Sequence, residues 1–172
     1  LSQRDIRYRN TAVHKYISNS GLKSDNVKGD GNCFFRALSY CLHGNEDQHA
    51  RLRSAIAQHL CDCGDVIFAN VDDLSADPVI YRNCAASIST DGFWPGEHVI
   101  KVAACYLQRD IHVYAAHSQQ PLHYAPLLHS SSSSEPLYLA FYEPGHYNAV
   151  VRRHAPSPEH SGNYATPAKQ RH

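Results

Sequence analysis

The stretch KGDGNCFFRALSYCLHG, residues 28–44, constrains the fold of this chain most strongly, because it joins a turn to a helix. Asp, Gly and Asn favour turns, and Asn is among the best N-terminal caps of helices. Apolar side chains then recur with helical spacing at Phe34, Leu38, Cys41 and Leu42. Gly44 follows where a helix would end. The pattern predicts a helix that is capped by Asn32, begins at Cys33 and buries one face.

Cys33 would then lie at the N-terminus of that helix. Unpaired N–H groups and the helix macrodipole favour negative charge there, so they predict a lowered pKa for the Cys33 thiol. A thiolate is a nucleophile, and the same N–H groups can bind the oxyanion of an acyl intermediate. Most free cysteines, however, are small buried side chains without a chemical role. The local pattern alone leaves both interpretations open.

The composition indicates a single globular domain in a reducing compartment. A chain of 172 residues can bury a substantial core without disulfides. Sixteen basic residues balance sixteen acidic ones, so no general attraction to nucleic acid or anionic membranes is expected. No apolar run approaches the roughly 18 residues of a membrane helix. Six irregularly spaced cysteines and the absence of Asn-x-Ser/Thr sequences favour the cytoplasm or nucleus, in a host cell if the source is a pathogen.

One short segment needs testing as a metal site. Cys61 and Cys63 form a C-x-C pair next to His59, but no second pair of ligands follows at zinc-finger spacing. We therefore expect a helix end with buried thiols and no metal ion.

Helices are expected in the first two thirds of the chain. The spacing of apolar residues predicts helices over 1–20, 46–62 and 97–108. Asn45 is the expected cap of the second helix. Its buried residues should be Leu52, Ile56 and Leu60. The third helix should bury Val99, Ile100, Ala103, Tyr106 and Leu107. Residues 72–90 should form short helices and loops, and residues 91–96 a turn.

Strands are expected later. Runs rich in Val, Ile, Leu and Tyr predict strands at 111–115, 122–127, 137–142 and 147–152. The serine run 130–134 predicts a solvated hairpin loop, and the polar residues 154–172 predict a disordered tail. Helices first and strands later favour one α+β domain over 1–153, with 1–20 as an N-terminal helical extension.

A cysteine nucleophile needs a base, and the base must be held in place. Of the thirteen histidines, His146 is singled out because it follows a Glu-Pro-Gly turn and opens a predicted strand. Residues i and i+2 of a strand share a face, so Asn148 would stand beside His146 and fix its tautomer. Cys, His and Asn in this order is the arrangement of papain-like proteases.

These residues resemble a known family. DGNCFFRA, residues 30–37, resembles the D-G-N-C-L-F-R-A signature of the ovarian tumour (OTU) cysteine proteases. GHYN at 145–148 is similar to the closing element of that family, a His followed by an aromatic residue and Asn or Asp. Between them, FWPGE at 93–97 and IHVY at 111–114 resemble the family's aromatic-Gly-Gly-Glu and I-x-V-Y segments. Phe34 replaces the family's Leu and Pro95 replaces a glycine.

The resemblance implies a deubiquitinase with a papain-like fold, a central, mostly antiparallel sheet flanked by helices. Cys33 would attack the carbonyl of ubiquitin's terminal glycine at an isopeptide bond. His146 would be the general base and would then protonate the leaving lysine amine. Asn148 would orient His146, and either Asn148 or Asp30 would be the third catalytic member. Judged from the residues alone, Asp30 fixes the loop that forms the oxyanion hole.

The resemblance also implies the partners. The substrate-binding residues would be Gly31, Asn32, Trp94 and Tyr147. The expected partner of a monomeric enzyme is ubiquitin or polyubiquitin, with no metal, organic cofactor, nucleic acid or membrane. Three alternatives stay open: a protease for another ubiquitin-like modifier, a ubiquitin-binding module with little activity, and a cysteine hydrolase with unrelated substrates.

Overall fold

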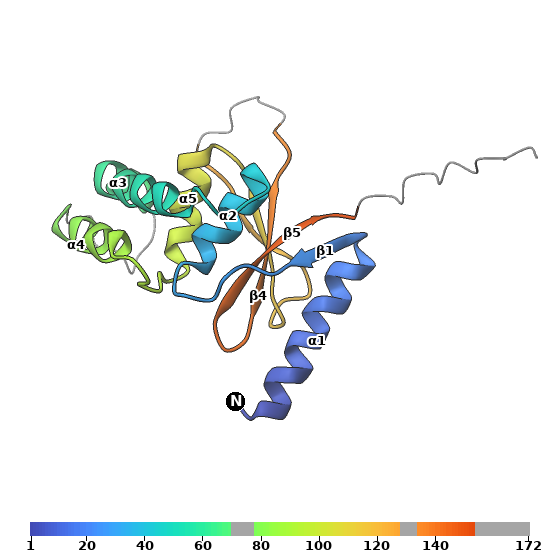
Figure 1. Ribbon diagram of the computed structural model, residues 1–172. Coiled ribbons are helices and arrows are strands. Elements are labelled where there is room, and N and C mark those ends of the chain that lie inside the picture. Colours follow the sequence, from blue (N-terminus) through green and yellow to red (C-terminus); the bar gives the residue numbers. More distant parts are fainter. Residues whose placement is uncertain (70–77, 128–133, 154–172) are drawn as a thin grey trace, which may run out of the picture.

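A five-stranded sheet divides the molecule, with one helix on one face and four on the other (Figure 1). This computed structural model describes residues 1–69, 78–127 and 134–153. The helices are α1 (Gln3–Asn19), α2 (Cys33–His43), α3 (His49–Ile67), α4 (Pro78–Ser89) and α5 (His98–Leu107). The strands are β1 (Leu22–Asp25), β2 (Ile111–Tyr114), β3 (Leu122–Tyr124), β4 (Leu137–Tyr142) and β5 (His146–Arg152).

The sheet is mixed, and mostly antiparallel as expected. Its strand order is β1-β5-β4-β2-β3, in which β2 and β4 are parallel and the other neighbours are antiparallel. Strands β4 and β5 are joined by a short turn, and Tyr142 at the end of β4 pairs with His146 at the start of β5. The predicted catalytic histidine therefore lies at one end of the sheet, beside a tight connection.

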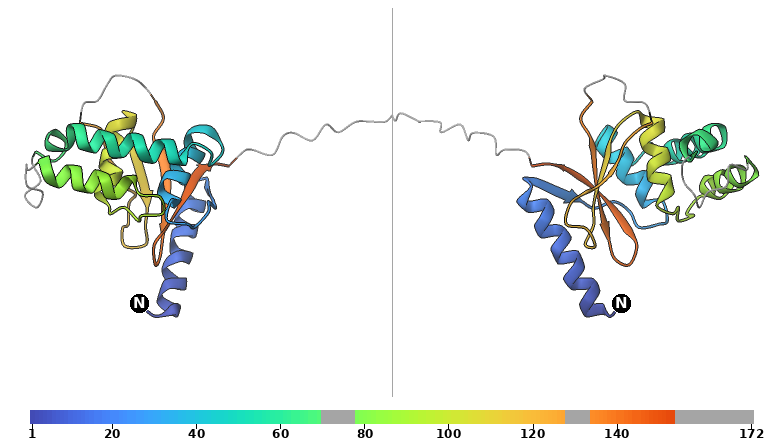
Figure 2. Two further views of the ribbon diagram at one scale, coloured as in Figure 1. Left: turned by 60° about the vertical axis from the view of Figure 1, so that its left-hand side comes forward. Right: turned by 180° about the vertical axis from the view of Figure 1, so that it is seen from behind.

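Each face of the sheet has its own core. On one face, Val13 and Ile17 of α1 pack against apolar side chains of the sheet, among them Tyr114 and Val150. On the other, α2 and α5 lie against the sheet, and α3 and α4 form an outer layer (Figure 2). Helix α2 thus contacts both the sheet and α3, and Phe35 is as completely buried as Phe34. The prediction of a single buried face was too narrow, because this helix is enclosed from two sides.

Most helix boundaries agree with the sequence, but α3, expected over 46–62, runs from His49 to Ile67, and one side chain of α5 differs in burial. Gly44 ends α2 with a φ of 75°, in the left-handed region that favours glycine. Helix α3 begins later than expected, at His49, with Gln48 in the cap position. Asn45 is not the cap, because its side chain accepts the N–H of Asp47 in the preceding turn. In α5, Tyr106 was expected to be buried and is 41% exposed.

The strand pattern was predicted well except at two places. Strand β1 was missed, because its four residues are half-polar and are paired only with the distant β5. The segment between β3 and β4 is not a hairpin, because β2 lies between these two strands. Residues 128–133 and the expected disordered tail, 154–172, lie outside the described residues. Within the described ranges no helix is long and apolar enough to cross a bilayer.

Candidate active site

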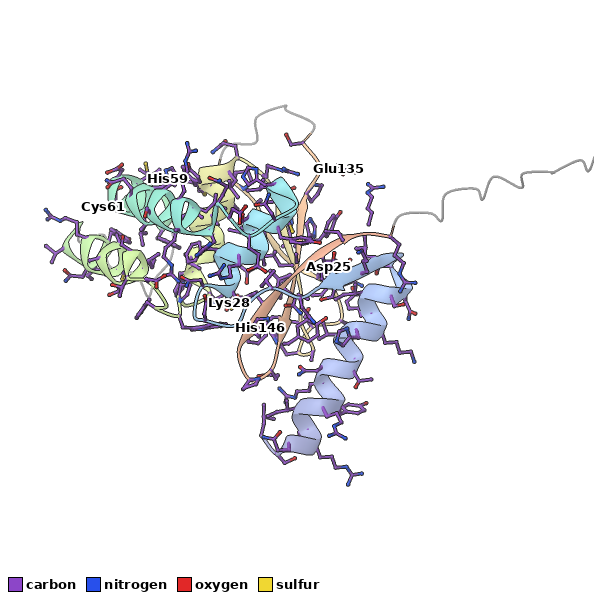
Figure 3. All side chains as sticks on the ribbon, viewed as in Figure 1. Asp25, Lys28, His59, Cys61, Glu135 and His146 are labelled. Atoms are coloured by element: carbon purple, nitrogen blue, oxygen red, sulfur yellow. The ribbon has the colours of Figure 1, made fainter. Side chains whose placement is uncertain are left out.

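Cys33 and His146 come together where the first turn of α2 meets the start of β5. Cys33 is the first residue of α2, and its Sγ accepts the N–H of Tyr147 at 3.5 Å. His146 precedes Tyr147 and lies beside the loop that carries Lys28 (Figure 3). A side chain at Gly29 of that loop would be 3.5 Å from Nδ1 of His146. The imidazole thus has its Nδ1 edge toward the loop that leads to Cys33.

Asn148 fixes the orientation and the tautomer of His146. Its Oδ1 lies 2.8 Å from Nε2 of His146, as the strand periodicity predicts. The same Oδ1 accepts the backbone N–H of Val27 at 3.3 Å, and its Nδ2 donates to Asn26 at 2.8 Å. A backbone N–H can only donate, so the atom that faces Val27 and His146 must be the amide oxygen. Nε2 of His146 is then the donor to Asn148, so in the neutral imidazole Nδ1 is the nitrogen with the free lone pair.

The Cys33 thiol differs from the expectation for a helix N-terminus. Its side chain is only 2% exposed. Burial raises the pKa of Cys33, although the N–H groups of Tyr147, Phe34 and Cys33 itself act in the opposite direction. The charge of Asp30 adds to the rise. The predicted lowering of the pKa of Cys33 was therefore wrong for this structure, because burial outweighs the N–H groups at the start of α2.

Asp30 is bound to its own loop and to α2. Its Oδ1 accepts the N–H of Asn32 at 3.1 Å and Nε of Arg36 at 3.1 Å, and its Oδ2 accepts Nη2 of Arg36 at 2.7 Å. These bonds to Arg36 hold the pKa of Asp30 far below its usual value. The carboxylate therefore closes the turn before Cys33, whereas Asn148 is the residue hydrogen-bonded to the histidine.

Gly31 and Asn32 are internal parts of this loop. Gly31 has a φ of 81°, and a Cβ there would lie 2.0 Å from the carbonyl oxygen of Gly92, so only glycine fits. Asn32 occupies the cap position of α2 but makes no capping hydrogen bond. Its amide instead donates to Asp91 at 3.1 Å and accepts the N–H of Gly92 at 3.3 Å. The predicted side-chain cap was wrong, because this amide joins two loops.

Arg53 is a functional candidate that the sequence reading missed. It is 2% exposed, and its Nη1 and Nη2 donate to four carbonyl oxygens. The acceptors belong to Gly31, Ile88, Thr90 and Phe93. The guanidinium also lies 4.4 Å above the ring of Phe35. A signal was present, because an arginine at 53 shares a helix face with the buried Ile56 and Ala57.

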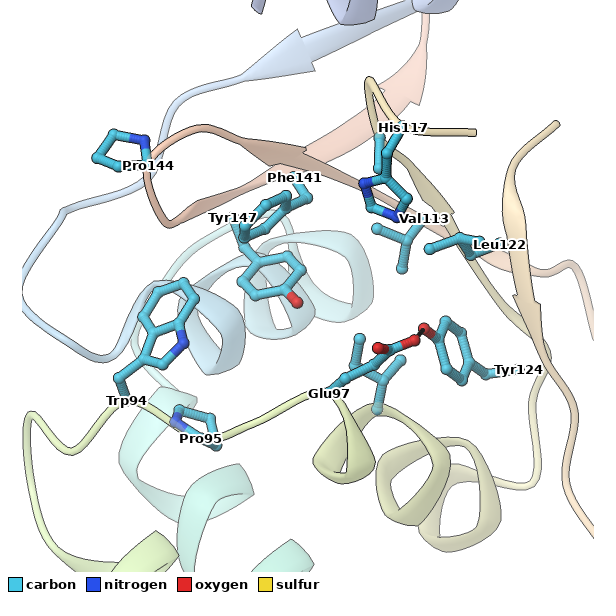
Figure 4. Close-up of a pocket in the computed structure, with 12 residues that line it drawn as sticks. Trp94, Pro95, Glu97, Val113, His117, Leu122, Tyr124, Phe141, Pro144 and Tyr147 are labelled. Carbon is cyan, nitrogen blue, oxygen red and sulfur yellow. Dashed lines mark hydrogen bonds between the residues drawn. The ribbon is translucent and has the colours of Figure 1, made fainter. Parts of the chain in front are cut away.

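Trp94 and Tyr147 form a wall next to the site. Their rings stack with centroids 5.6 Å apart, and Trp94 is 39% exposed. A pocket of about 220 Å³ opens beside them (Figure 4). Its lining includes Trp94, Pro95, Leu122, Tyr124, Phe141 and Tyr147. Across it, the Tyr124 hydroxyl donates to Glu97, which stands at the N-cap of α5. The segment around Pro95 therefore borders a hollow in which aromatic side chains lie beside the polar groups of Glu97 and His117.

Residues able to ligate a metal ion gather away from Cys33. Ligand atoms of Asp110, His112 and His123 lie within 4.8 Å of one another. Asp110 already pairs with His123 at 3.3 Å, and the two histidine rings stack 4.6 Å apart. Asp110 precedes β2, at the end of the sheet opposite to His146. Cys61 and Cys63 are half-buried within α3.

Comparisons with known proteins assign the chain to a family. The family model described as OTU-like cysteine protease matches residues 28–147. An Arabidopsis thaliana protein, OVARIAN TUMOR DOMAIN-containing deubiquitinating enzyme 7, is 27% identical over 130 residues, which are 76% of this chain and 33% of that protein. The chain thus spans about a third of the length of that relative.

Solved structures are similar in fold. The OTU domain of OTUD1 matches with a TM-score of 0.68 at 21% identity, over 87% of this chain and 99% of that one. An OTU domain solved in complex with ubiquitin matches with a TM-score of 0.56 at 17% identity, over 75% of this chain and 69% of the other.

Proposed function

We propose that this chain, which belongs to the OTU-like cysteine protease family, is a thiol isopeptidase that releases ubiquitin from lysine side chains or from ubiquitin chains. One observation carries the proposal: Asn148 accepts a hydrogen bond from Nε2 of His146, and the N–H of the next residue, Tyr147, is donated to the sulfur of the buried Cys33. The choice of substrate is supported by the relatives named as deubiquitinating enzymes and by the OTU domain in complex with ubiquitin.

His146 starts the reaction in this proposal. Its free Nδ1 takes the proton of the Cys33 thiol, and the sulfur attacks the carbonyl carbon of the terminal glycine. The imidazolium is stabilised by the Asn148 oxygen that accepts its Nε2–H. It then gives the proton to the departing lysine amine, which leaves a thioester on Cys33. Attack by water, with His146 again as base, frees the carboxylate and restores the thiol.

The loop before Cys33 would stabilise the oxyanion. The Asn32 N–H is already bonded to Asp30, so the oxyanion donors proposed in this loop are the remaining N–H groups, among them that of Cys33. Asp30 shapes this loop and takes no proton. Trp94 and Tyr147 border the path of the flexible ubiquitin C-terminus. Gly31 and Asn32, which were expected to bind substrate, act by holding the loop.

A ubiquitin whose terminal carboxylate is replaced by an electrophile tests the proposal. It should attach covalently to the wild type at Cys33, and no adduct should form with Cys33→Ala, which retains the fold. His146→Ala should label far more slowly. Reaction only with the probe of another modifier would replace ubiquitin as the substrate. Binding of ubiquitin without an adduct would favour a binding module, and reaction with neither probe would favour an unrelated hydrolase.

The compartment is also part of the proposal. All six cysteines are free thiols, which supports a reducing environment such as the cytoplasm or nucleus.

A further inference from the structure

The position of His146 depends on the turn that precedes it. Residues 143–145 connect β4 to β5, and Tyr142 and His146 are paired on either side of this turn. A shift of the turn would therefore carry the imidazole with it. A side chain that binds the turn therefore contributes to the placement of His146 relative to Cys33.

Helix α1 binds this turn through hydrogen bonds of the Asn10 side chain. Its Nδ2 donates to the carbonyl oxygen of Glu143 at 2.9 Å, and its Oδ1 accepts the N–H of the same residue at 2.9 Å. One amide side chain thus satisfies both backbone groups of Glu143, as a neighbouring strand would. Arg9 pairs with the Glu143 carboxylate at 3.3 Å, and the ring of His14 lies 4.8 Å from that of Tyr142.

We propose that α1 is a positioning element for His146, and that it acts through the two hydrogen bonds between Asn10 and Glu143. The inference rests on the function proposed above, in which His146 is the base. Helix α1 lies outside the region matched by the family model, residues 28–147, so it is an addition to the matched part of the domain. Asn10 does not touch the reacting atoms; it fixes the backbone from which His146 projects.

The proposal predicts a specific kinetic pattern. Removing both bonds frees the turn while β5 stays paired with β1 and β4. Misplacement of a catalytic group by about 1 Å can reduce a rate about a hundredfold, so a smaller shift should reduce kcat about tenfold. KM should change little, because α1 packs on the face of the sheet opposite to α2, whose first turn carries Cys33.

Asn10→Ala is the test, with Asn19→Ala as its control. Asn19 is an exposed residue at the far end of α1, so the control makes the same chemical change without touching the turn. Alanine favours helix more than asparagine does, so neither substitution weakens α1 itself. The first measurement is kcat and KM with a fluorogenic ubiquitin substrate, well below the melting temperature.

The second measurement needs no ubiquitin. Alkylation of Cys33 by iodoacetamide is followed against pH by peptide mass spectrometry, which separates it from the exposed Cys84. The profile of Asn10→Ala should move toward that of His146→Ala, and the profile of Asn19→Ala should match the wild type. A purely structural role of Asn10 would lower the melting temperature without moving this profile.

The two proposals can fail separately. A wild type that neither cleaves nor is labelled by ubiquitin would overturn the proposed substrate, while the alkylation profiles still report on His146. Wild-type kcat and an unmoved profile in Asn10→Ala would overturn the role of α1. Equal losses of kcat in Asn10→Ala and Asn19→Ala would overturn it as well.

Discussion

The two halves of the site are held in different ways. The loop before Cys33 is fixed from inside the helical layer, by the fully buried guanidinium of Arg53 and the Arg36–Asp30 pair. The start of β5 is held by amide side chains: the half-buried Asn10 on one side, and on the other the buried Asn148, which is bonded to the exposed Asn26. The proposed nucleophile thus belongs to the core of the fold, and the proposed base lies nearer to its surface.

Because of this difference, substitutions in the two halves should have different effects on stability and on catalytic rate. Buried charged donors are costly to remove, because their acceptors are left without partners inside the protein. The contacts of Asn10 and Asn26 can be replaced by water, so their loss should leave the fold intact and alter the geometry of the site, whereas loss of the buried Asn148 should also cost some stability. Substitutions on the cysteine side should therefore reduce the free energy of unfolding, and substitutions on the histidine side should mainly reduce turnover.

The largest effect is expected at Arg53. Arg53→Met leaves four carbonyl oxygens without their donor, so it should reduce the free energy of unfolding by about 3 kcal/mol or more. Denaturant unfolding measures this. Arg51→Met, an exposed position on the same helix, is the matched control and should stay within about 0.5 kcal/mol of the wild type. Equal stability of the two variants would contradict the view that Arg53 stabilises the cysteine half of the site.

Asn148→Ala should have the next largest effect, and chiefly on rate. Without its oxygen the imidazole loses both its orientation and its tautomer, and kcat should fall about a hundredfold. The unpaired N–H of Val27 should cost about 1–3 kcal/mol of stability. Steady-state kinetics with a melting curve separates the two. Asn26→Ala, which removes only the partner of the Asn148 Nδ2, should lose less activity. A wild-type kcat in Asn148→Ala would assign the orienting role elsewhere.

The smallest effect is expected for Asp30→Asn, and it should depend on pH. Hydrogen bonds from Arg36 lower the pKa of Asp30 in the folded state. Its charge therefore stabilises the fold above the unfolded pKa of about 3.9, and this stability is lost as the pH falls through the folded pKa. The variant should be about 1 kcal/mol less stable than the wild type near neutral pH. Unfolding curves at neutral and acidic pH should show that the difference in free energy of unfolding between wild type and variant becomes smaller as the pH falls. A difference that does not change with pH would show that the charge of Asp30 is not its cause.

Local pattern predicted the parts of the site that are close in sequence. Phe34 and Leu38 are buried as the helical spacing of α2 indicated. The separation of His146 and Asn148 by two strand residues placed them on one face, where they are hydrogen-bonded. The turn at Asp30 and Gly31 was also predicted, because backbone sterics and short-range hydrogen bonds determine its conformation.

Contacts between distant parts of the chain were not predictable in this way. Asn10 and Glu143 meet only because α1 packs across the sheet, and Arg53 reaches Gly31 only because α3 packs on α2. The prediction for the pKa of Cys33 failed for the same reason. The position of Cys33 at a helix terminus can be inferred from nearby residues, but the burial of its thiol depends on the whole fold. Strand β1 has too few apolar residues to be predicted from its own sequence, and it forms by pairing with the distant β5.

The stacked pair of Trp94 and Tyr147 has an optical consequence. Trp94 is the single tryptophan of the chain, so all indole fluorescence arises at this one place. Its ring is partly exposed, borders the pocket and lies near Gly145 of the turn before His146. In the proposed function the C-terminus of ubiquitin passes beside Trp94, so its binding should displace water from the indole and change the emission. The protein should therefore need no added label for occupancy of the proposed site to be followed in real time.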